Sequence, residues 1–242
     1  MRPSRLLLGA LVGAQVLYPR VASRRRDAAT RGIVALMLVT SVAETLEARG
    51  PRRALALGAS AAAIGFASEV AGVATGRPFG HYVYSGKLGP RVAGVPLLAA
   101  AAWTMMARPA WVVAGLVAHR RASRVALAAA ALAAWDVFLD PRMVRDGYWA
   151  WPMGGRFEDV PASNFAGWLA VGGAIFAVWS ALDGARPARD GTDDGALALY
   201  VWTWAGEAVA NVAFWGRPRV ALAGGVAMGA VALPALRARV RR

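Results

Sequence analysis

The 242-residue chain contains no cysteine, only two histidines and a single lysine. The absence of cysteine excludes a disulfide framework, a thiol nucleophile and a thiolate metal site. Two histidines, His81 and His119, are too few for the multi-histidine iron sites of membrane oxygenases and desaturases. Chemistry in this chain therefore falls to carboxyl groups, hydroxyls, amides and aromatic rings, and we expect no metal and no cofactor.

Acidic residues are also scarce, with 14 Asp and Glu against 28 Lys and Arg and a formal net charge of +14 at pH 7. Nearly all of the positive charge is arginine in short connections between apolar runs. Arginine in that position meets anionic lipid headgroups and sets membrane topology. We therefore expect a lipid bilayer as the partner of this charge, and no nucleic acid.

Apolar residues make up 57% of the chain, and several windows of about 20 residues hold almost no charge, which is the length that a helix needs to cross a bilayer. This pattern predicts an all-α fold, a polytopic transmembrane bundle of seven to eight helices that forms a single integral membrane domain over residues 1–242. We expect it in the cell membrane. The predicted helices are 5–18, 32–48, 54–74, 94–118, 122–140, 164–182, 196–215 and 219–236.

The first predicted helix is short for a membrane crossing, because about 14 residues span only about 21 Å. We favour a helix over a cleaved signal peptide there, since no A-x-A-like cleavage site precedes Arg20. The fourth helix contains Arg108 and Pro109, and we expect one kinked helix rather than two crossings.

Two long loops, 75–93 and 141–163, are separated by two crossings and therefore lie on the same membrane face. Which face this is stays open, because basic residues are shared almost equally between the two sides. The loop 183–195 lies on the opposite face and carries four aspartates. We expect it to be a solvated linker. Its aspartates are Asp183, Asp190, Asp193 and Asp194.

Five of the acidic residues inside predicted helices call for a partner or a function, because each costs about 3 kcal/mol to insert. They are Glu44, Glu69, Asp136, Asp140 and Glu207. All except Glu44 lie toward the helix ends that meet the two long loops. A spacing of four residues puts Asp136 with Asp140, and Glu207 with Asn211, on one side of each helix. The sequence thus predicts a pocket of several carboxyl groups at one membrane surface.

A plainer interpretation stays open for each of these carboxylates, namely an ion pair with an arginine. The candidate arginines are Arg77, Arg91, Arg108 and Arg142. We expect a merely structural role above all for Glu44, which lies near the opposite face.

The long loops are rich in aromatic residues. The first contributes His81, Tyr82 and Tyr84, and the second contributes Tyr148, Trp149, Trp151 and Phe157, with Asn164 opening the next helix. Such residues commonly anchor a protein at the membrane interface. Anchoring explains less well why these residues flank the carboxylates.

The same two regions carry a resemblance to a known family. The first reads GRPFGHYVY at 76–84, followed by LGP at 88–90, GVP at 94–96 and WTMM at 103–106. The second reads DVFLDPRM at 136–143, followed by GYWAW at 147–151, GG at 154–155, VP at 160–161 and NFAGW at 164–168. Together they resemble the membrane carotenoid hydratases of carotenoid biosynthesis, of the bisanhydrobacterioruberin hydratase type. The resemblance covers about a third of the chain.

The resemblance implies a hydro-lyase that adds water to the terminal trisubstituted double bond of an acyclic carotenoid and gives a tertiary alcohol. Its reactants would be a hydrophobic carotenoid and water, and it would work beside other carotenoid-biosynthesis enzymes. Hydration of an unactivated alkene needs a proton donor, and a carboxyl group sheltered from water can keep its proton near neutral pH. A second carboxylate can orient the water, and aromatic faces stabilise the intermediate cation.

On this chemistry, either Asp136 or Glu69 is the acid, and Asp140 and Glu207 are candidates for activating water. Asn164 or Asn211 would give hydrogen-bonding support. The division of roles among them stays open. We expect substrate contacts from His81, Tyr82, Tyr84, Trp149, Trp151, Asn164 and Asn211.

Two other functions remain. Asp136 and Asp140 form a D-x-x-x-D pair that suits a magnesium-bound diphosphate, as in a polyprenyl transferase, but a second aspartate-rich motif is missing. The chain could instead be a non-catalytic carotenoid-binding or transport protein. A transporter commonly shows internal repeats, and none is evident here.

Overall fold

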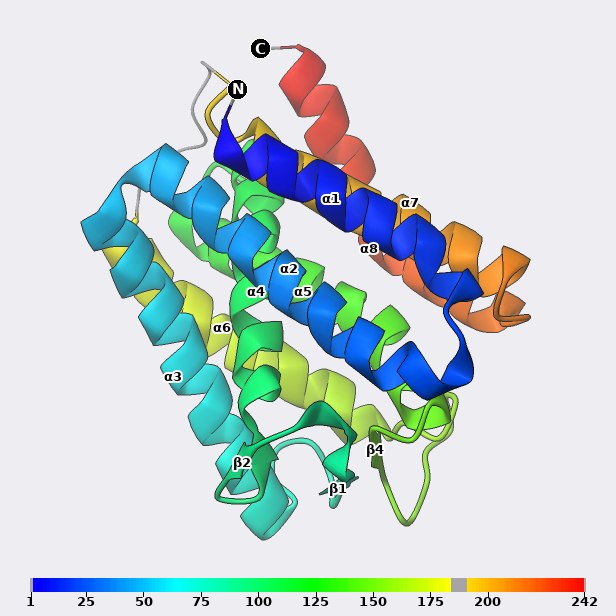
Figure 1. Cartoon of the computed structure of the whole chain (residues 1–242). Helices are drawn as coiled ribbons and strands as arrows, with labels where there is room; N and C mark the ends of the chain where they lie inside the picture. The colour runs from blue at the N-terminus through cyan, green and yellow to red at the C-terminus, as the bar shows by residue number, and fades with distance from the viewer. Residues whose placement is uncertain (1, 184–190, 242) are drawn as a thin grey trace.

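The computed structural model describes residues 2–183 and 191–241, and within them the chain folds into eight α-helices (Figure 1). The helices are α1 (Pro3–Leu17), α2 (Ser23–Arg49), α3 (Pro51–Thr75), α4 (Leu97–Val117), α5 (Arg121–Arg145), α6 (Ala162–Leu182), α7 (Asp194–Ala213) and α8 (Pro218–Val240). Between them lie two short 3-10 helices, η1 (Tyr18–Arg20) and η2 (Gly86–Leu88), and four two-residue strands. The strands are β1 (Val83–Tyr84), β2 (Arg91–Val92), β3 (Val95–Pro96) and β4 (Trp149–Ala150).

Six helices, α2 to α6 and α8, are long and apolar enough to cross a membrane. The prediction of an all-α membrane bundle of seven to eight helices is confirmed, with eight helices in the described chain. The 15 residues of α1 extend about 22 Å, which is less than the hydrocarbon thickness of about 30 Å.

Glycine and proline set the helix boundaries. Gly50, at φ 76°, separates α2 from α3, and Pro51 occupies the first turn of α3, where its missing N–H costs nothing. Gly76, at φ 74°, adopts the left-handed conformation that ends α3. Gly50 reverses the chain within one residue, so α2 and α3 pack as neighbours.

Helix α4 occupies the centre of the bundle and packs against α2, α3, α5, α7 and α8 (Figure 1). Its residues are buried from Met105 through Leu116, including Arg108 and Pro109. The helix continues through Pro109, as predicted for a single crossing.

The two long loops meet at one end of the bundle, where β1, β2 and β4 gather in Figure 1. Strand β1 pairs with β4 in antiparallel register, so that Val83 faces Ala150 and Tyr84 faces Trp149. The prediction that both loops lie on the same face is therefore confirmed.

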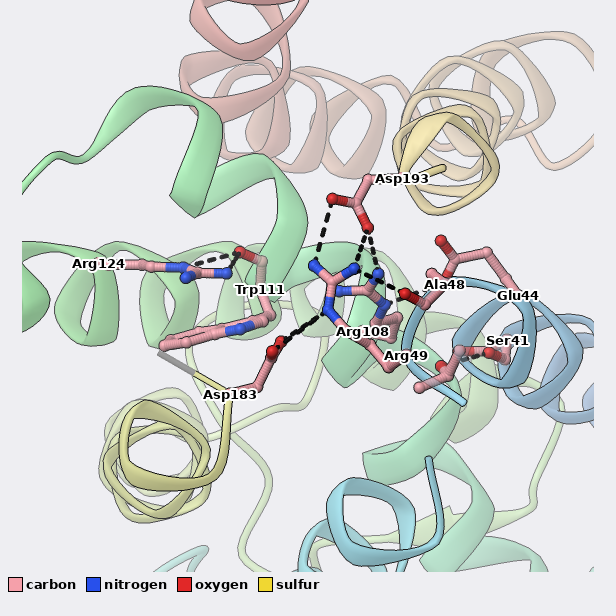
Figure 2. A network of polar contacts seen from close by, with 10 residues as sticks. Ser41, Glu44, Ala48, Arg49, Arg108, Trp111, Arg124, Asp183 and Asp193 are labelled. Carbon is pink, nitrogen blue, oxygen red and sulfur yellow. Dashed lines mark hydrogen bonds and ion pairs between the residues drawn. The ribbon is translucent and has the colours of Figure 1, made fainter. Parts of the chain in front are cut away.

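A network of ion pairs occupies the other end of the bundle (Figure 2). Arg108 donates from Nε to Glu44 Oε2 at 3.0 Å and from its terminal nitrogen to Asp193. Arg49 contacts Asp183 at 3.2 Å and Asp193 at 3.1 Å. The network joins α2 and α4 to the segments that flank α6 and α7. It confirms the plainer interpretation of Glu44 as the partner of an arginine.

The prediction of a solvated linker at 183–195 is wrong for Asp183 and Asp193. Asp183 and Asp193 are only 1% and 4% exposed, because Arg49 and Arg108 neutralise them inside the protein. Asp194 pairs with Arg239 at 2.6 Å, and Asp190 lies outside the described residues. The partners are far apart in sequence, so local composition gave no sign of them.

Close packing of α3 on α4 gives a test of this arrangement. A Cβ at Gly65 would collide with the Trp103 ring, whereas a Cβ at Gly58 on the same helix would meet its nearest atom, in Thr104, at 3.9 Å. We predict that Gly65→Ala lowers the free energy of unfolding by about 1–3 kcal/mol. Gly58→Ala should leave it unchanged or raise it by up to about 1 kcal/mol. Thermal unfolding in detergent measures both, and equal effects would contradict the packing.

Candidate active site

A cavity with an empty volume of about 580 Å³ lies at the loop end of the bundle. Its lining residues come from α2 to α6 and from both long loops. They are Val34, Glu69, Phe79, Tyr82, Tyr84, Leu88, Leu98, Ala99, Ala102, Met105, Leu139, Asp140, Met143, Trp149, Trp151, Asn164 and Trp168. Most are apolar or aromatic, and none is lysine or arginine. Such a mostly apolar cavity with a few convergent polar groups suits a hydrophobic ligand.

Glu69, near the end of α3, has both carboxylate oxygens occupied by neutral donors. The hydroxyl of Tyr82 donates to Oε2 at 2.5 Å and that of Tyr84 donates to the same oxygen at 2.7 Å. The indole of Trp103 donates to Oε1 at 3.1 Å. These three hydrogen bonds replace the water that an ionised carboxylate loses on burial.

The two tyrosines stay protonated in this setting. Burial, followed by the neighbouring Glu69 carboxylate, raises the pKa of the Tyr82 and Tyr84 hydroxyls well above their ordinary value. Both hydroxyls therefore serve as hydrogen-bond donors over the whole pH range in which the protein would work.

Asp136 and Asp140 lie one turn apart on α5, and both are almost fully buried, at 0% and 3% exposed. The amide of Asn164 on α6 bridges them, donating from Nδ2 to Asp136 Oδ2 at 2.8 Å and to Asp140 Oδ2. Trp149 lines the same cavity as Asp140. Two carboxylates this close in an apolar site repel each other when both are ionised. The arrangement therefore suits a pair that shares one proton.

The other carboxylate oxygen of Asp136 does not contact Asn164. Its Oδ1 is buried and has no hydrogen-bond partner among the described residues. An orphaned buried oxygen of this kind is costly when it carries charge and cheaper when it carries a proton.

Aromatic rings form a continuous wall around these carboxyl groups. Tyr84 contacts Tyr82 and Trp149 edge to face, with ring centroids at 5.3 and 5.7 Å, and Trp151 lies 5.7 Å from Tyr82. Trp103 and Trp168 stack at 3.9 Å at the inner end. An aromatic wall can stabilise a cation by the charge distribution of its ring faces.

Sequence reasoning missed three members of this wall, Phe79, Trp103 and Trp168. Each lies within the stretches that carry the family resemblance, which was the available signal. Only the packing of α3, α4 and α6 shows that they face the same cavity as Glu69.

Most of the predicted site residues do come together. Glu69, Asp140, Tyr82, Tyr84, Trp149, Trp151 and Asn164 line the cavity, and Asp136 is joined to it through Asn164. His81 does not: it is exposed, and its ring lies against Gly76 outside the lining. The loop turns between His81 and Tyr82, so only the tyrosine faces inward.

Glu207 and Asn211 also lie apart from the cavity. Asn211 donates to the backbone carbonyl of Glu207 at 2.9 Å and to its carboxylate at 3.4 Å, so the two form a local pair on α7. Helix α7 packs mainly on α8 and α4, whereas α6 packs on α5 and supplies Asn164. The prediction that α7 joins α3 and α5 at the pocket is therefore wrong. The direction of α7 correctly predicted the end of the bundle at which Glu207 and Asn211 lie, but it could not predict which helices pack against each other.

Fold and site together define a polytopic membrane protein whose apolar, aromatic cavity holds carboxyl groups at one membrane surface. The sequence profile of the family described as "Carotenoid biosynthesis protein" matches residues 29–232, and the chain belongs to this family. The bisanhydrobacterioruberin hydratase of Haloarcula japonica is 36% identical over 109 residues. The aligned part covers 43% of this chain and 37% of that relative. No solved structure matches.

The bridge by Asn164 leads to a prediction about stability. Asn164→Leu keeps the size of the side chain but leaves two buried carboxyl groups without their shared donor. We predict a loss of about 1–3 kcal/mol in the free energy of unfolding. Ser163→Ala, an exposed position in the same helical turn, is the matched control and should change it by less than about 0.5 kcal/mol. Equal chemical-denaturation midpoints for both variants would show that the Asn164 bridge does not contribute to the free energy of unfolding.

Proposed function

We propose that this protein is a carotenoid hydratase of the cell membrane, which adds water to the terminal trisubstituted double bond of an acyclic carotenoid and forms a tertiary alcohol. The observation that carries the proposal is the pair Asp136 and Asp140, bridged by Asn164 and buried beside an apolar cavity. The family to which the chain belongs and the printed name of its hydratase relative support the same reaction.

The first step is proton transfer. One proton held by the Asp136 and Asp140 pair moves to the less substituted carbon of the double bond, and the π electrons form the new C–H bond. The more substituted carbon becomes a tertiary cation. Asp140 lines the cavity and Asp136 stands behind it, so Asp140 is the group that touches the substrate and Asp136 is its proton partner.

The cation then forms within reach of a negative charge and several ring faces. Glu69, held in place by Tyr82, Tyr84 and Trp103, lies on the same cavity without any cation of its own among the described residues. A fixed carboxylate in a site shielded from water stabilises a developing positive charge. We therefore assign the acid to the aspartate pair and not to Glu69, because three donors already point at the Glu69 oxygens.

Water completes the reaction. It attacks the tertiary cation and forms the C–O bond, and the resulting oxonium returns a proton to the now ionised aspartate pair. The acid is thereby regenerated, and atoms and charge balance without a cofactor. The long loops that cover the cavity lie at the membrane surface, where water is available.

The carotenoid must reach the cavity from lipid, since it is wholly hydrophobic. Val34 on α2 and Leu98 and Ala102 on α4 line the cavity and are half-buried, so they lie at the edge where it meets the outside of the bundle. We propose this seam between α2 and α4 as the lateral entrance.

The central prediction compares three carboxyl groups. In a host that makes lycopene, Asp136→Asn and Asp140→Asn should lower the yield of hydrated pigment by at least ~100-fold, because the acid is lost. Glu207→Gln, at a half-buried carboxyl group outside the cavity, should leave the yield within about twofold of the original. Mass analysis of extracted pigments, with protein levels measured in parallel, checks this. Full activity in both aspartate variants would remove the pair from the site.

A second prediction tests the entrance. Ala102→Trp should fill the seam and reduce hydrated product by at least ~10-fold, because the substrate can no longer enter the apolar cavity. Ala100→Trp, two residues away on α4 and outside the cavity lining, is the matched control and should retain product. Equal product from the two variants, at equal protein level, would place the entrance elsewhere.

The two other functions have less support. A magnesium diphosphate needs basic residues facing the carboxylates, and the cavity lining contains neither lysine nor arginine. Within residues 2–183 and 191–241, no group of three or more histidine, cysteine or acidic side chains is arranged to hold a metal ion. Loss of activity on adding a chelator would nevertheless favour the transferase. Bound pigment of unchanged mass would favour a carotenoid-binding scaffold.

A further inference from the structure

The cavity of the candidate active site is closed at its inner end. Helices α4 and α6 both start at the loop end of the bundle and run away from it (Figure 1). The last residues of these helices that line the cavity are Met105 and Trp168, which are only 3% and 5% exposed. One turn further, Pro109 and Gly172 are buried and lie outside the lining. The cavity therefore ends at Met105 and Trp168, which we call its floor.

Aromatic rings hold this floor in place. The Trp168 ring stacks on Trp103 with the ring centroids 3.9 Å apart, and the Trp135 ring contacts Trp168 edge to face at 5.9 Å. Gly65 leaves room for the Trp103 ring, because a Cβ at that position would collide with it. Closely packed rings leave Trp168 little room to move. A ligand that reaches the floor therefore stops there.

The cavity is much shorter than an acyclic carotenoid. Along α4 its lining runs from Leu98 to Met105, and the rise between these positions is about 10 Å. A fully extended acyclic carotenoid is longer than the hydrocarbon core of a bilayer, which is about 30 Å thick. Only one end of such a molecule fits in the cavity, so the rest of its chain must lie in lipid.

The polar groups that can select a substrate lie around that end. Asp140 and Asn164 line the cavity, whereas the lining residues at the proposed entrance are the apolar Val34, Leu98 and Ala102. The free energy of burying a chain against apolar side chains follows the buried area and does not depend on conjugation. The entrance therefore contacts a conjugated and an unconjugated hydrocarbon chain alike.

We propose that this protein selects its substrate by the end group alone, and that it therefore hydrates acyclic isoprenoid hydrocarbons whether or not their chain is conjugated. This inference rests on the proposed function and widens its substrate class. The shared end group is a trisubstituted double bond that carries two methyl groups. It enters until the methyl groups reach the floor and the double bond lies beside Asp140. The aspartate pair then gives the proton of the new C–H bond, and water forms the C–O bond and returns a proton.

The test uses the purified full-length protein in detergent and three hydrocarbons, with mass analysis of the products. Lycopene and squalene have the same end group, but only lycopene has a conjugated chain. β-Carotene has a conjugated chain, but its ends are closed into rings. We expect squalene to be hydrated at a rate within ~10-fold of that of lycopene, because the two differ only outside the pocket. We expect no hydrated β-carotene.

Two adjacent methionines of α4 test the floor. Met105→Ala removes part of the floor, whereas Met106→Ala removes the same atoms from a fully buried position outside the lining. Met105→Ala should lower the hydration of lycopene and of squalene by the same factor, at least ~10-fold, because both lose the contact that positions their end group. Met106→Ala, compared at equal protein level, should keep both rates within about threefold of the original.

The results separate this inference from the proposed function. Hydration of lycopene but not of squalene would overturn the inference and leave the hydratase in place, as would a Met105→Ala variant that loses activity on only one of the two hydrocarbons. Hydration of neither would contradict the proposed function, and the inference with it. The comparison of hydrocarbons uses the unaltered protein, so it decides the question even if Met105→Ala does not fold.

Discussion

The cost of holding a carboxylate inside a bilayer is the constraint on which this structure depends, and the protein meets it in two different ways. At one end, Arg49 and Arg108 pair with Glu44, Asp183 and Asp193, so charge is neutralised by charge. At the other end, neutral donors hold Glu69, Asp136 and Asp140, and no described residue forms an ion pair with them. The first arrangement closes the bundle, whereas the second leaves its acidic groups available for reaction.

That difference is the reason why we place the proposed acid catalysis at the loop end of the bundle. A guanidinium beside a carboxylate favours its ionised form. Asn164 satisfies Asp136 and Asp140 without supplying a charge, so the repulsion between the two remains and a proton relieves it. In the proposed mechanism, the surrounding aromatic rings shield the pair from water and their faces stabilise the cation.

Much of the fold and part of the candidate site could be predicted from the sequence, because the signals for them are local. The uncharged runs predicted all eight helices, and most helix ends lie within one or two turns of their predicted positions. The largest difference is the start of α2, which was predicted at residue 32 and lies at Ser23. Counting crossings placed the two long loops together, which the pairing of Tyr84 with Trp149 confirms. The spacing of Asp136 and Asp140 predicted a pair on one face of α5.

The predictions that failed concerned contacts between segments that are distant in the sequence. The face that α7 presents to its neighbours was not encoded in its own periodicity, so Glu207 and Asn211 were expected in a pocket that α6 lines instead. Asp183 and Asp193 resembled a polar linker because their arginine partners are many residues away in the chain. His81 and Tyr82 are adjacent in sequence, and only the path of the loop decides which one faces inward.

The claim that one proton is shared between Asp136 and Asp140 can be measured directly by infrared spectroscopy of the protein in lipid. We predict the carbonyl stretch of a protonated carboxyl group at neutral pH. This band should be lost or shifted in Asp136→Asn and in Asp140→Asn, and it should persist in Glu207→Gln. A spectrum in which neither aspartate variant changes any protonated-carboxyl band would contradict it, because the proposed acid would then hold no proton to give.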